Sequence, residues 1–146
     1  MGRLLGIATR TATKVPMTEV ASSRITPAAG VAGEFRGEPG ERQVVVVARE
    51  GWDAACRELG VALAWTLRRG NLLVEGVELA ASTGARLQVG GALLEITGEC
   101  DPCFVMDKQH PGLRKALGPD WRGGVACRVL RGGEIAVGDS VSIERG

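Results

Sequence analysis

Two cysteines separated by two residues are the part of this 146-residue chain whose types and spacing best suit chemistry. Cys100 and Cys103 lie in the stretch GECDPCF, directly after the apolar segment ALLEIT. Such a pair can supply half of a zinc site or a redox-active dithiol, and one exposed cysteine can act as a nucleophile or bind a soft metal. Cysteine is also commonly buried as a small apolar residue, so a purely structural role stays open.

The zinc and dithiol alternatives have less support than a single working cysteine. A closed zinc site needs four ligands, and the remaining candidates are Cys56, Cys127 and the only histidine, His110. Cys56 falls on the apolar face of an expected helix and Cys127 within an expected strand. A thioredoxin-type dithiol lies at the start of a helix in an alternating strand–helix pattern, which the residues after Cys103 do not clearly show. One histidine excludes mechanisms that need two, and His110 is as suited to a surface or capping role as to acid–base chemistry.

Composition and charge restrict the classes of function. The chain is 45% hydrophobic and 24% charged, as expected of a globular protein, and its formal net charge of +1 argues against general binding to nucleic acid or to an anionic membrane. The cations are 15 Arg and 3 Lys; arginine suits phosphate recognition, although G+C-rich coding explains much of the excess. No segment is long and apolar enough for a signal peptide or a membrane span. We therefore expect one cytoplasmic domain spanning residues 1–146, with reduced thiols.

Short apolar segments separated by glycine-containing turns predict a mostly β protein. Strands are expected near residues 4–7, at Val44–Ala48, and at 71–77, 85–89, 92–97, 124–130, 134–137 and 140–144; helices are expected at Glu50–Leu59 and 111–117; residues 11–40 are expected to form a long loop. The stretches LQVGGALLEI and IAVGDSVSIE each predict a hairpin. The pattern is typical of a β-sandwich or of a closed or partly open β-barrel, with two or three short helices.

The order of these segments resembles the MOSC domain, the module found at the C-terminus of molybdenum cofactor sulfurases. The resemblance runs over essentially the whole chain and rests on RQVVVV, a Trp-bearing helix, RRGNLLVEGVEL, ALLEITGECDPC, HPGLRKAL, RGGVACRVLRGG and GEIAVGDSV. It implies a barrel similar to the β-barrel domain of pyruvate kinase. Cys103 matches the family's working cysteine, which ligates molybdenum in a pterin cofactor in MOSC-containing reductases and was also proposed to carry persulfide sulfur.

The resemblance further implies cofactor-binding positions. Arg69-Gly70-Asn71 resembles the family's Arg-Pro-Asn, whose side chains hold the pterin and its phosphate, and Lys14 resembles a basic position in the early loop. The stretch GVAGEFR differs from the family's G-x-x-G-D-x-H, with Glu34 for the Asp and Arg36 for the His. This change weakens a role in proton transfer, but Arg36 keeps a cation that can meet an anionic group. A turn at Gly70-Asn71 and a solvated Lys14 are the plain structural alternatives.

Three functional hypotheses follow from the residues and the resemblance. The first is a stand-alone MOSC protein that binds the molybdenum–pterin cofactor or its sulfur through Cys103; it would be the catalytic subunit of a reductase of small N-hydroxylated compounds and would need a separate redox partner protein. The second is a persulfide sulfur carrier supplied by a desulfurase, with Cys100 as a helper. The third is a non-catalytic small-ligand barrel with both cysteines buried. Whether the chain is an enzyme stays open at this point. Pyridoxal phosphate belongs to the separate sulfurase domain of fused proteins and is not expected here, because no Schiff-base lysine is evident.

Overall fold

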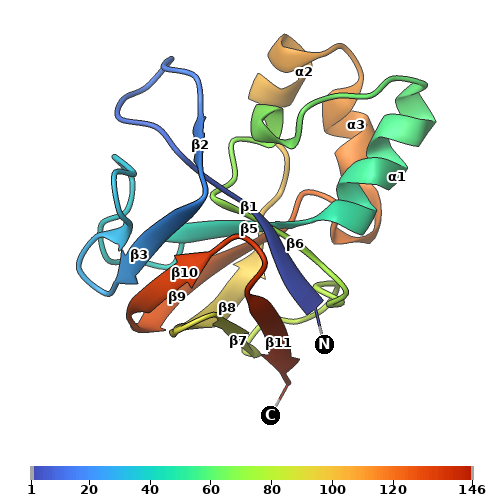
Figure 1. The fold of residues 1–146 in the computed structure, drawn as a ribbon. Helices are drawn as coiled ribbons and strands as arrows, with labels where there is room; N and C mark the ends of the chain where they lie inside the picture. Colours follow the sequence, from blue (N-terminus) through green and yellow to red (C-terminus); the bar gives the residue numbers. More distant parts are fainter. Residues whose placement is uncertain (1, 146) are drawn as a thin grey trace.

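Seven strands close into a barrel in the computed structural model, which describes residues 2–145 (Figure 1). The ring consists, in order, of β1 (Gly2–Thr9), β11 (Ser140–Glu144), β7 (Arg86–Val89), β8 (Ala92–Glu99), β9 (Val125–Arg131), β5 (Val44–Ala48) and β6 (Leu72–Glu75), and β6 pairs back to β1. All neighbours in the ring are antiparallel except β5 and β6, which are parallel. The expected barrel is thus confirmed, and it is closed.

Apolar side chains from alternate positions of the strands fill the barrel, because successive residues of a strand point to opposite faces. The largest of these residues include Leu4, Ile7, Val44, Leu72, Leu87, Leu94 and Ile96. Strand β5 is apolar on both faces: Val44 and Val46 belong to the barrel interior, whereas Val45 and Val47 pack in a second cluster with the helices. This double burial explains the continuous run of β-branched residues at this strand.

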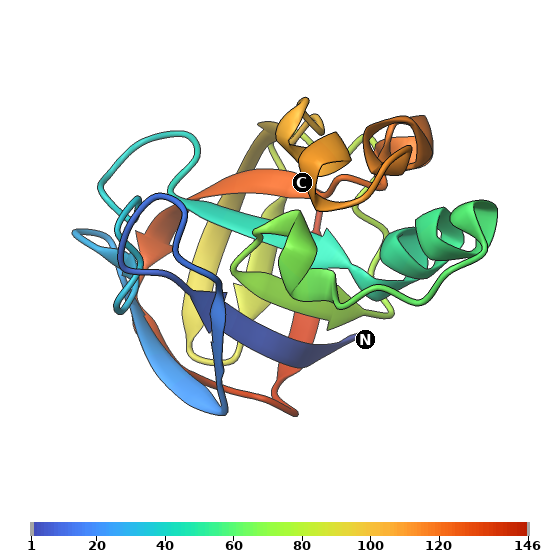
Figure 2. The same ribbon diagram turned by 90° about the horizontal axis from the view of Figure 1, so that it is seen from above.

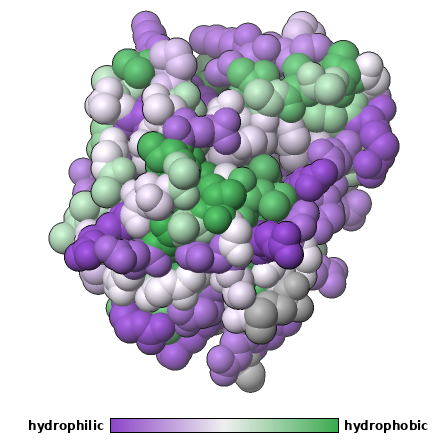
Figure 3. Space-filling view, in the orientation of Figure 1, coloured by the Kyte–Doolittle hydropathy of each residue, from purple (hydrophilic) through white to green (hydrophobic). Residues whose placement is uncertain are grey.

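Three short helices cover one side of the barrel: α1 (Arg49–Leu59), α2 (Val105–Gln109) and α3 (Leu113–Leu117) (Figures 1 and 2). Two 3-10 turns, η1 (Trp65–Arg68) and η2 (Pro119–Trp121), connect them to the strands. The second apolar cluster joins the helices to the barrel through Trp52, Met106 and Leu113. Polar side chains cover much of the face in Figure 3, with an apolar area at the upper right, where the helices lie. No helix within residues 2–145 is both long and apolar enough to cross a membrane.

The segments predicted best are those with strong local periodicity. Strand β5 has the expected bounds, and α1 begins one residue before the expected helix and ends at the same residue. Gly60 follows α1 with a φ of 70°, a left-handed conformation that glycine adopts readily. The LQVGGALLEI hairpin is confirmed as the antiparallel pair β7–β8.

Two sequence-based expectations were wrong. Residues 11–40 are not one long loop, since they contain β2 (Thr18–Val20), β3 (Ser22–Thr26) and β4 (Gly30–Val31). Strands β10 (Gly133–Ala136) and β11 do not form a hairpin; β10 pairs with β3 in a separate three-stranded sheet. The turn between them is tied to β1 instead, because Leu4 N–H donates to Asp139 O and Gly138 N–H donates to Leu4 O, both at 2.8 Å. That attachment directs β10 and β11 into different sheets.

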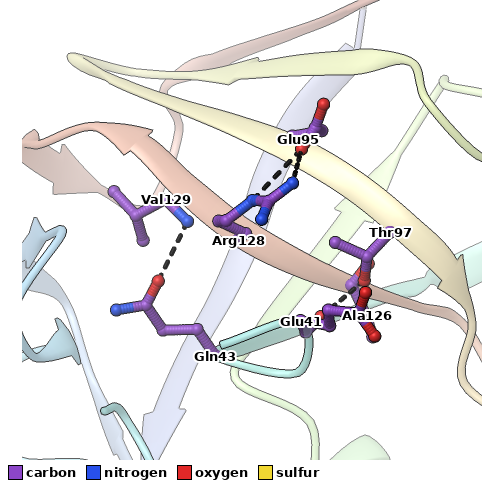
Figure 4. Close-up of polar contacts among 7 residues, drawn as sticks. All are labelled: Glu41, Gln43, Glu95, Thr97, Ala126, Arg128 and Val129. Carbon is purple, nitrogen blue, oxygen red and sulfur yellow. Dashed lines mark hydrogen bonds and ion pairs between the residues drawn. The ribbon is translucent and has the colours of Figure 1, made fainter. Parts of the chain in front are cut away.

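A buried glutamine fixes the segment that precedes β5 and carries Glu34 and Arg36. Gln43 is 3% exposed, and its Nε2 donates to Pro27 O at 2.7 Å and to Gly37 O at 3.0 Å. Its Oε1 accepts the Val129 N–H of β9 at 3.0 Å (Figure 4). Because a buried amide needs partners for its donors and acceptor, Gln43 holds residues 27–37 against the barrel. The Glu95–Arg128 pair and the Thr97–Glu41 contact add further links across β8, β9 and the β5 entry (Figure 4).

Gly133→Ala tests how the small sheet docks on the barrel. A Cβ at Gly133 would overlap the carbonyl oxygen of Gly91 in the β7–β8 turn. We expect a loss of about 1–3 kcal/mol in the free energy of unfolding, measured by urea denaturation. Gly98→Ala is the matched control, because no atom lies within 4 Å of the added Cβ and its φ is not left-handed. Equal stabilities for the two variants would contradict the close docking.

Candidate functional site

The loop after β8 brings one cysteine to the surface. Cys103 is exposed, whereas the other three cysteines are buried. Cys100 is 5% exposed, and its N–H donates to Gly124 O at 2.9 Å, which fixes the start of the loop at the entry to β9. Phe104, the next residue after Cys103, is 61% exposed and has the Lys108 ammonium 5.1 Å from its ring centroid. Cys103 is therefore the thiol of this chain most accessible to a ligand.

The guanidinium of Arg42 lies against this loop. Its Nη2 donates to Cys100 Sγ at 3.3 Å. The hydrogen bond and charge interaction with Cys100 raise the pKa of Arg42, with smaller contributions in the same direction from Cys103 and Asp101. A cation thus contacts the buried thiol of the Cys-x-x-Cys stretch. The sequence analysis did not select Arg42, because its position beside Cys100 depends on a contact between segments 58 residues apart.

A second cation, Arg68 at the end of η1, is buried beside the same loop. It is 6% exposed, and it donates from Nε to Gly123 O and from Nη2 to Cys100 O, both at 2.8 Å. Within residues 2–145 no carboxylate lies within ion-pair distance of it. A Cβ at Gly123 would lie 2.6 Å from Cys100 O, so glycine is needed for this approach. Arg68 therefore fixes the cysteine loop and adds uncompensated positive charge to it.

Two titratable groups in the strands beside the loop, Glu99 of β8 and Cys127 of β9, have raised pKa values. Burial, together with the neighbouring Asp101, raises the pKa of the Glu99 carboxyl. Burial, with a smaller contribution from Cys100, raises the pKa of the Cys127 thiol well above its usual range. Cys127 therefore stays protonated at neutral pH and is a poor nucleophile.

The Asn71 side chain joins two strands and a loop. Its Nδ2 donates to Ala8 O of β1 at 3.2 Å and to Glu34 Oε1 at 3.1 Å, and its Oδ1 accepts the Val45 N–H of β5 at 3.0 Å. The residue is 5% exposed. Both amide donors are thus used inside the protein, which makes Asn71 a positioning residue in this structure.

Glu34 completes this junction. Its Oε1 also accepts the Arg10 N–H at 3.3 Å, and its Oε2 accepts the Arg36 N–H at 3.1 Å. The carboxylate therefore holds the end of β1 to the loop that carries Arg36. The sequence analysis identified Glu34 only as a substitution for Asp and did not anticipate this contact.

The other residues selected from the sequence are cations whose side chains donate no hydrogen bond within the described residues. Lys14 and Arg36 are exposed, and Arg69 is half-buried. Lys14 and Arg69 have positive φ values of 69° and 68°. Within the described part of the chain, none of their side chains makes a hydrogen bond or ion pair to a protein atom, and none is bonded to Cys103. Figure 1 shows the loop before β2, η1 and α2 on the same side of the barrel.

No set of ligands for zinc is present among the described residues. No three His, Cys, Asp or Glu side chains gather there in a metal-binding arrangement. Cys56 lies on α1 and Cys127 inside β9, as expected. His110 is the residue after α2, where its N–H donates to Met106 O at 3.0 Å. This backbone contact is typical of a residue that ends a helix.

The sequence pattern of the MOSC domain matches residues 24–142. The chain belongs to the MOSC family. Among solved structures, YuaD from Bacillus subtilis has a TM-score of 0.82 at 19% identity, covering 98% of this chain and 96% of YuaD. YiiM from Geobacillus stearothermophilus has a TM-score of 0.79 at 18% identity, covering 98% of this chain and 75% of that one. YiiM from Escherichia coli has a TM-score of 0.70 at 16% identity, with 97% and 69% covered.

At these identities the similarity to YuaD and YiiM shows a shared fold. No curated protein matches the sequence. The MOSC family is associated with the molybdenum cofactor, which suggests a function related to that cofactor. Strand β1 lies before the matched residues and is nevertheless part of the closed ring.

Asn71→Leu tests the positioning role of the amide. The change keeps a similar volume but leaves the Val45 N–H and the Ala8 carbonyl without this partner. We expect a loss of about 3 kcal/mol in the free energy of unfolding, measured by urea denaturation. Gln88→Leu is the control, since the half-buried Gln88 amide bonds only Gly90 O and the exposed Arg131. An Asn71→Leu protein as stable as this control would contradict the role.

Thiol labelling tests the exposure of Cys103 and the effect of Arg42. In the native protein we expect one fast-reacting thiol, lost in Cys103→Ser, and all four after unfolding. Arg42→Gln removes the hydrogen bond to Cys100 Sγ, so in a Cys103→Ser background it should speed the slow labelling of the buried Cys100 about three- to tenfold, because that thiol loses a contact that holds it in place. Arg131→Gln is the matched control, because Arg131 ends β9, whereas the cysteine loop is bonded to Gly124 just before the start of that strand. Fast labelling of a second cysteine in the native state, or an unchanged rate in Arg42→Gln, would contradict this description.

Proposed function

We propose that this MOSC protein binds a molybdenum–pterin cofactor, or sulfur destined for it, through the thiolate of Cys103. The observation that supports this most is the location of Cys103: it is the one exposed cysteine of four, on a loop faced by the Arg42 guanidinium. Thiolate sulfur is a soft ligand suited to a metal already held by a dithiolene, so one protein ligand is sufficient. The third hypothesis, with both cysteines buried, does not agree with the exposure of Cys103.

The residues around the loop fit such a group. Arg42 and Arg68 add positive charge next to the thiols, which favours an anionic ligand there. Within residues 2–145, the side chains of Lys14, Arg36 and Arg69 make no hydrogen bond or ion pair, so their N–H donors are available for the phosphate of a pterin cofactor. Asn71 would support this cofactor by holding β1, β5 and the Glu34 loop in place.

Bound molybdenum would supply two-electron redox chemistry, and the substrates we propose are small N-hydroxylated or N-oxide compounds. The chain would provide the thiolate, the basic surroundings and the fixed loop. The electrons would come from a separate redox partner protein. This chemistry requires reduced thiols, as found in the cytoplasm.

The second candidate function is transfer of persulfide sulfur. The Cys103 thiolate would attack the outer sulfur of a desulfurase persulfide, forming a new S–S bond and releasing the desulfurase thiolate, with no net change in oxidation state. The observation that favours this candidate is the Cys100 thiol three residues away, which already contacts the Arg42 cation. An acceptor thiolate would then attack the outer sulfur of the Cys103 persulfide, forming a new persulfide and releasing the Cys103 thiolate.

Metal analysis of protein made in a cofactor-proficient host tests the proposal. We expect molybdenum and pterin in the purified wild-type protein, and a molybdenum content lower by about tenfold or more in Cys103→Ser, because the variant lacks the proposed ligand. Cys56→Ala is the matched control, since that buried cysteine lies on α1.

The alternatives give different results in the same preparation. Cyanide-labile sulfur on Cys103 without molybdenum would favour the carrier function. Equal molybdenum in Cys103→Ser and wild type would contradict ligation by this residue, and the absence of both molybdenum and labile sulfur would contradict both functions.

A further inference from the structure

Arg10, which follows β1, is a buried cation without a hydrogen-bond partner for its guanidinium. The residue is 8% exposed, and its Nη1 is fully buried and unpaired. Within residues 2–145, Nε and Nη2 donate to no protein atom either. Arginine stays charged in proteins, and a buried charge without a counter-charge is costly. This arrangement therefore calls for an anion.

A second guanidinium contacts the same aromatic ring as the first. The Arg10 guanidinium carbon lies 5.0 Å from the Phe35 ring centroid, and the Arg36 guanidinium carbon lies 5.2 Å from the same centroid. Phe35 N–H donates to Arg10 O at 3.0 Å, so the ring and Arg10 share one fixed backbone contact. Cation–π contact orients each guanidinium but does not use its in-plane N–H donors.

The Glu34 carboxylate does not use the guanidinium donors of these cations. Its two oxygens accept hydrogen bonds from the Arg10 and Arg36 backbone N–H groups and from the Asn71 amide. Within the described residues, neither the Arg10 nor the Arg36 guanidinium forms an ion pair with it or with another acid. Two cations on one aromatic ring thus keep their forked donors for a ligand from outside.

We propose that Arg10 and Arg36 form a binding site for the phosphate group of a small phosphate ester, with Phe35 holding the two guanidinium groups in place. A phosphate dianion can accept bidentate hydrogen bonds from one arginine and further bonds from another, and it would balance the charge buried at Arg10. The phosphate could belong to a pterin cofactor or to a free phosphorylated compound. Arg36 is also one of the cations offered to the cofactor phosphate above, so this inference deepens the proposed function if the phosphate is the cofactor's. The site does not require Cys103, so the two proposals can fail separately.

Binding of inorganic phosphate to the purified full-length chain, made in a host that lacks the pterin cofactor, tests the site by calorimetry. We expect saturable binding to wild type that is unaffected by chloride at equal ionic strength. Arg10→Met should weaken it by about tenfold or more, because the buried donors are lost. Arg36→Gln, at an exposed position, should weaken it as well. Arg24→Gln is the matched control, because Arg24 is an exposed arginine already paired with Glu134.

The stability of the variants gives a second readout that a structural role would not reproduce. If Arg10 is an unpaired buried cation, Arg10→Met should be at least as stable as wild type in phosphate-free buffer, and phosphate should raise the melting temperature of wild type but not of Arg10→Met. Failure of wild type to bind phosphate at millimolar concentration, or equal binding by wild type and Arg10→Met, would overturn the proposal.

Two further measurements distinguish the possible sources of the phosphate and separate this proposal from the proposed role of Cys103. Cys103→Ser should bind phosphate like wild type, whatever its molybdenum content; a parallel loss of phosphate binding in this variant would contradict the independence of the site. Protein loaded with cofactor that no longer binds phosphate would assign the site to the cofactor's own phosphate, and loaded protein that still binds it would assign the site to a free phosphorylated ligand.

Discussion

One buried amide connects the parts of the barrel on which the candidate site depends. The side chain of Asn71 bonds Ala8 O of β1, the Val45 N–H of β5, and Glu34 in the loop between β4 and β5. Asn71 directly precedes β6, which forms the one parallel pair of the ring with β5. Since each of these backbone groups is costly to leave unpaired, a change at Asn71 moves two strands and a loop together. The arginines that face the site are carried by those same segments.

Positive charge is distributed over two groups of arginines with different partners. Arg42 and Arg68 contact the cysteine loop through the Cys100 thiol and carbonyl. Arg10 and Arg36 are held by Phe35 and have no internal acceptor within the described residues. The first group lies against the loop that carries the soft sulfur of Cys103, and the second suits a hard oxyanion. A ligand that carries both a soft metal and a phosphate would match both groups, and the molybdenum–pterin cofactor is such a ligand.

The sequence was informative where the signal is local. The β-branched run at Val44–Ala48 and the helix ending before Gly60 follow from periodicity and from a terminating glycine, and the order of the motifs indicated the family. Contacts between distant segments were not visible: the pairing of β10 with β3 depends on a turn bonded to Leu4. The roles of Arg10 and Arg68 depend on their burial, which residue type alone does not indicate, because most arginines are exposed.

The central claim is that the Cys103 sulfur is the protein ligand of the group bound here. X-ray absorption at the molybdenum edge, on cofactor-loaded wild type and on Cys103→Ser loaded to the highest attainable level, tests it directly. We predict one sulfur neighbour fewer around molybdenum in the variant than in wild type. Identical sulfur coordination in the two proteins would contradict the claim.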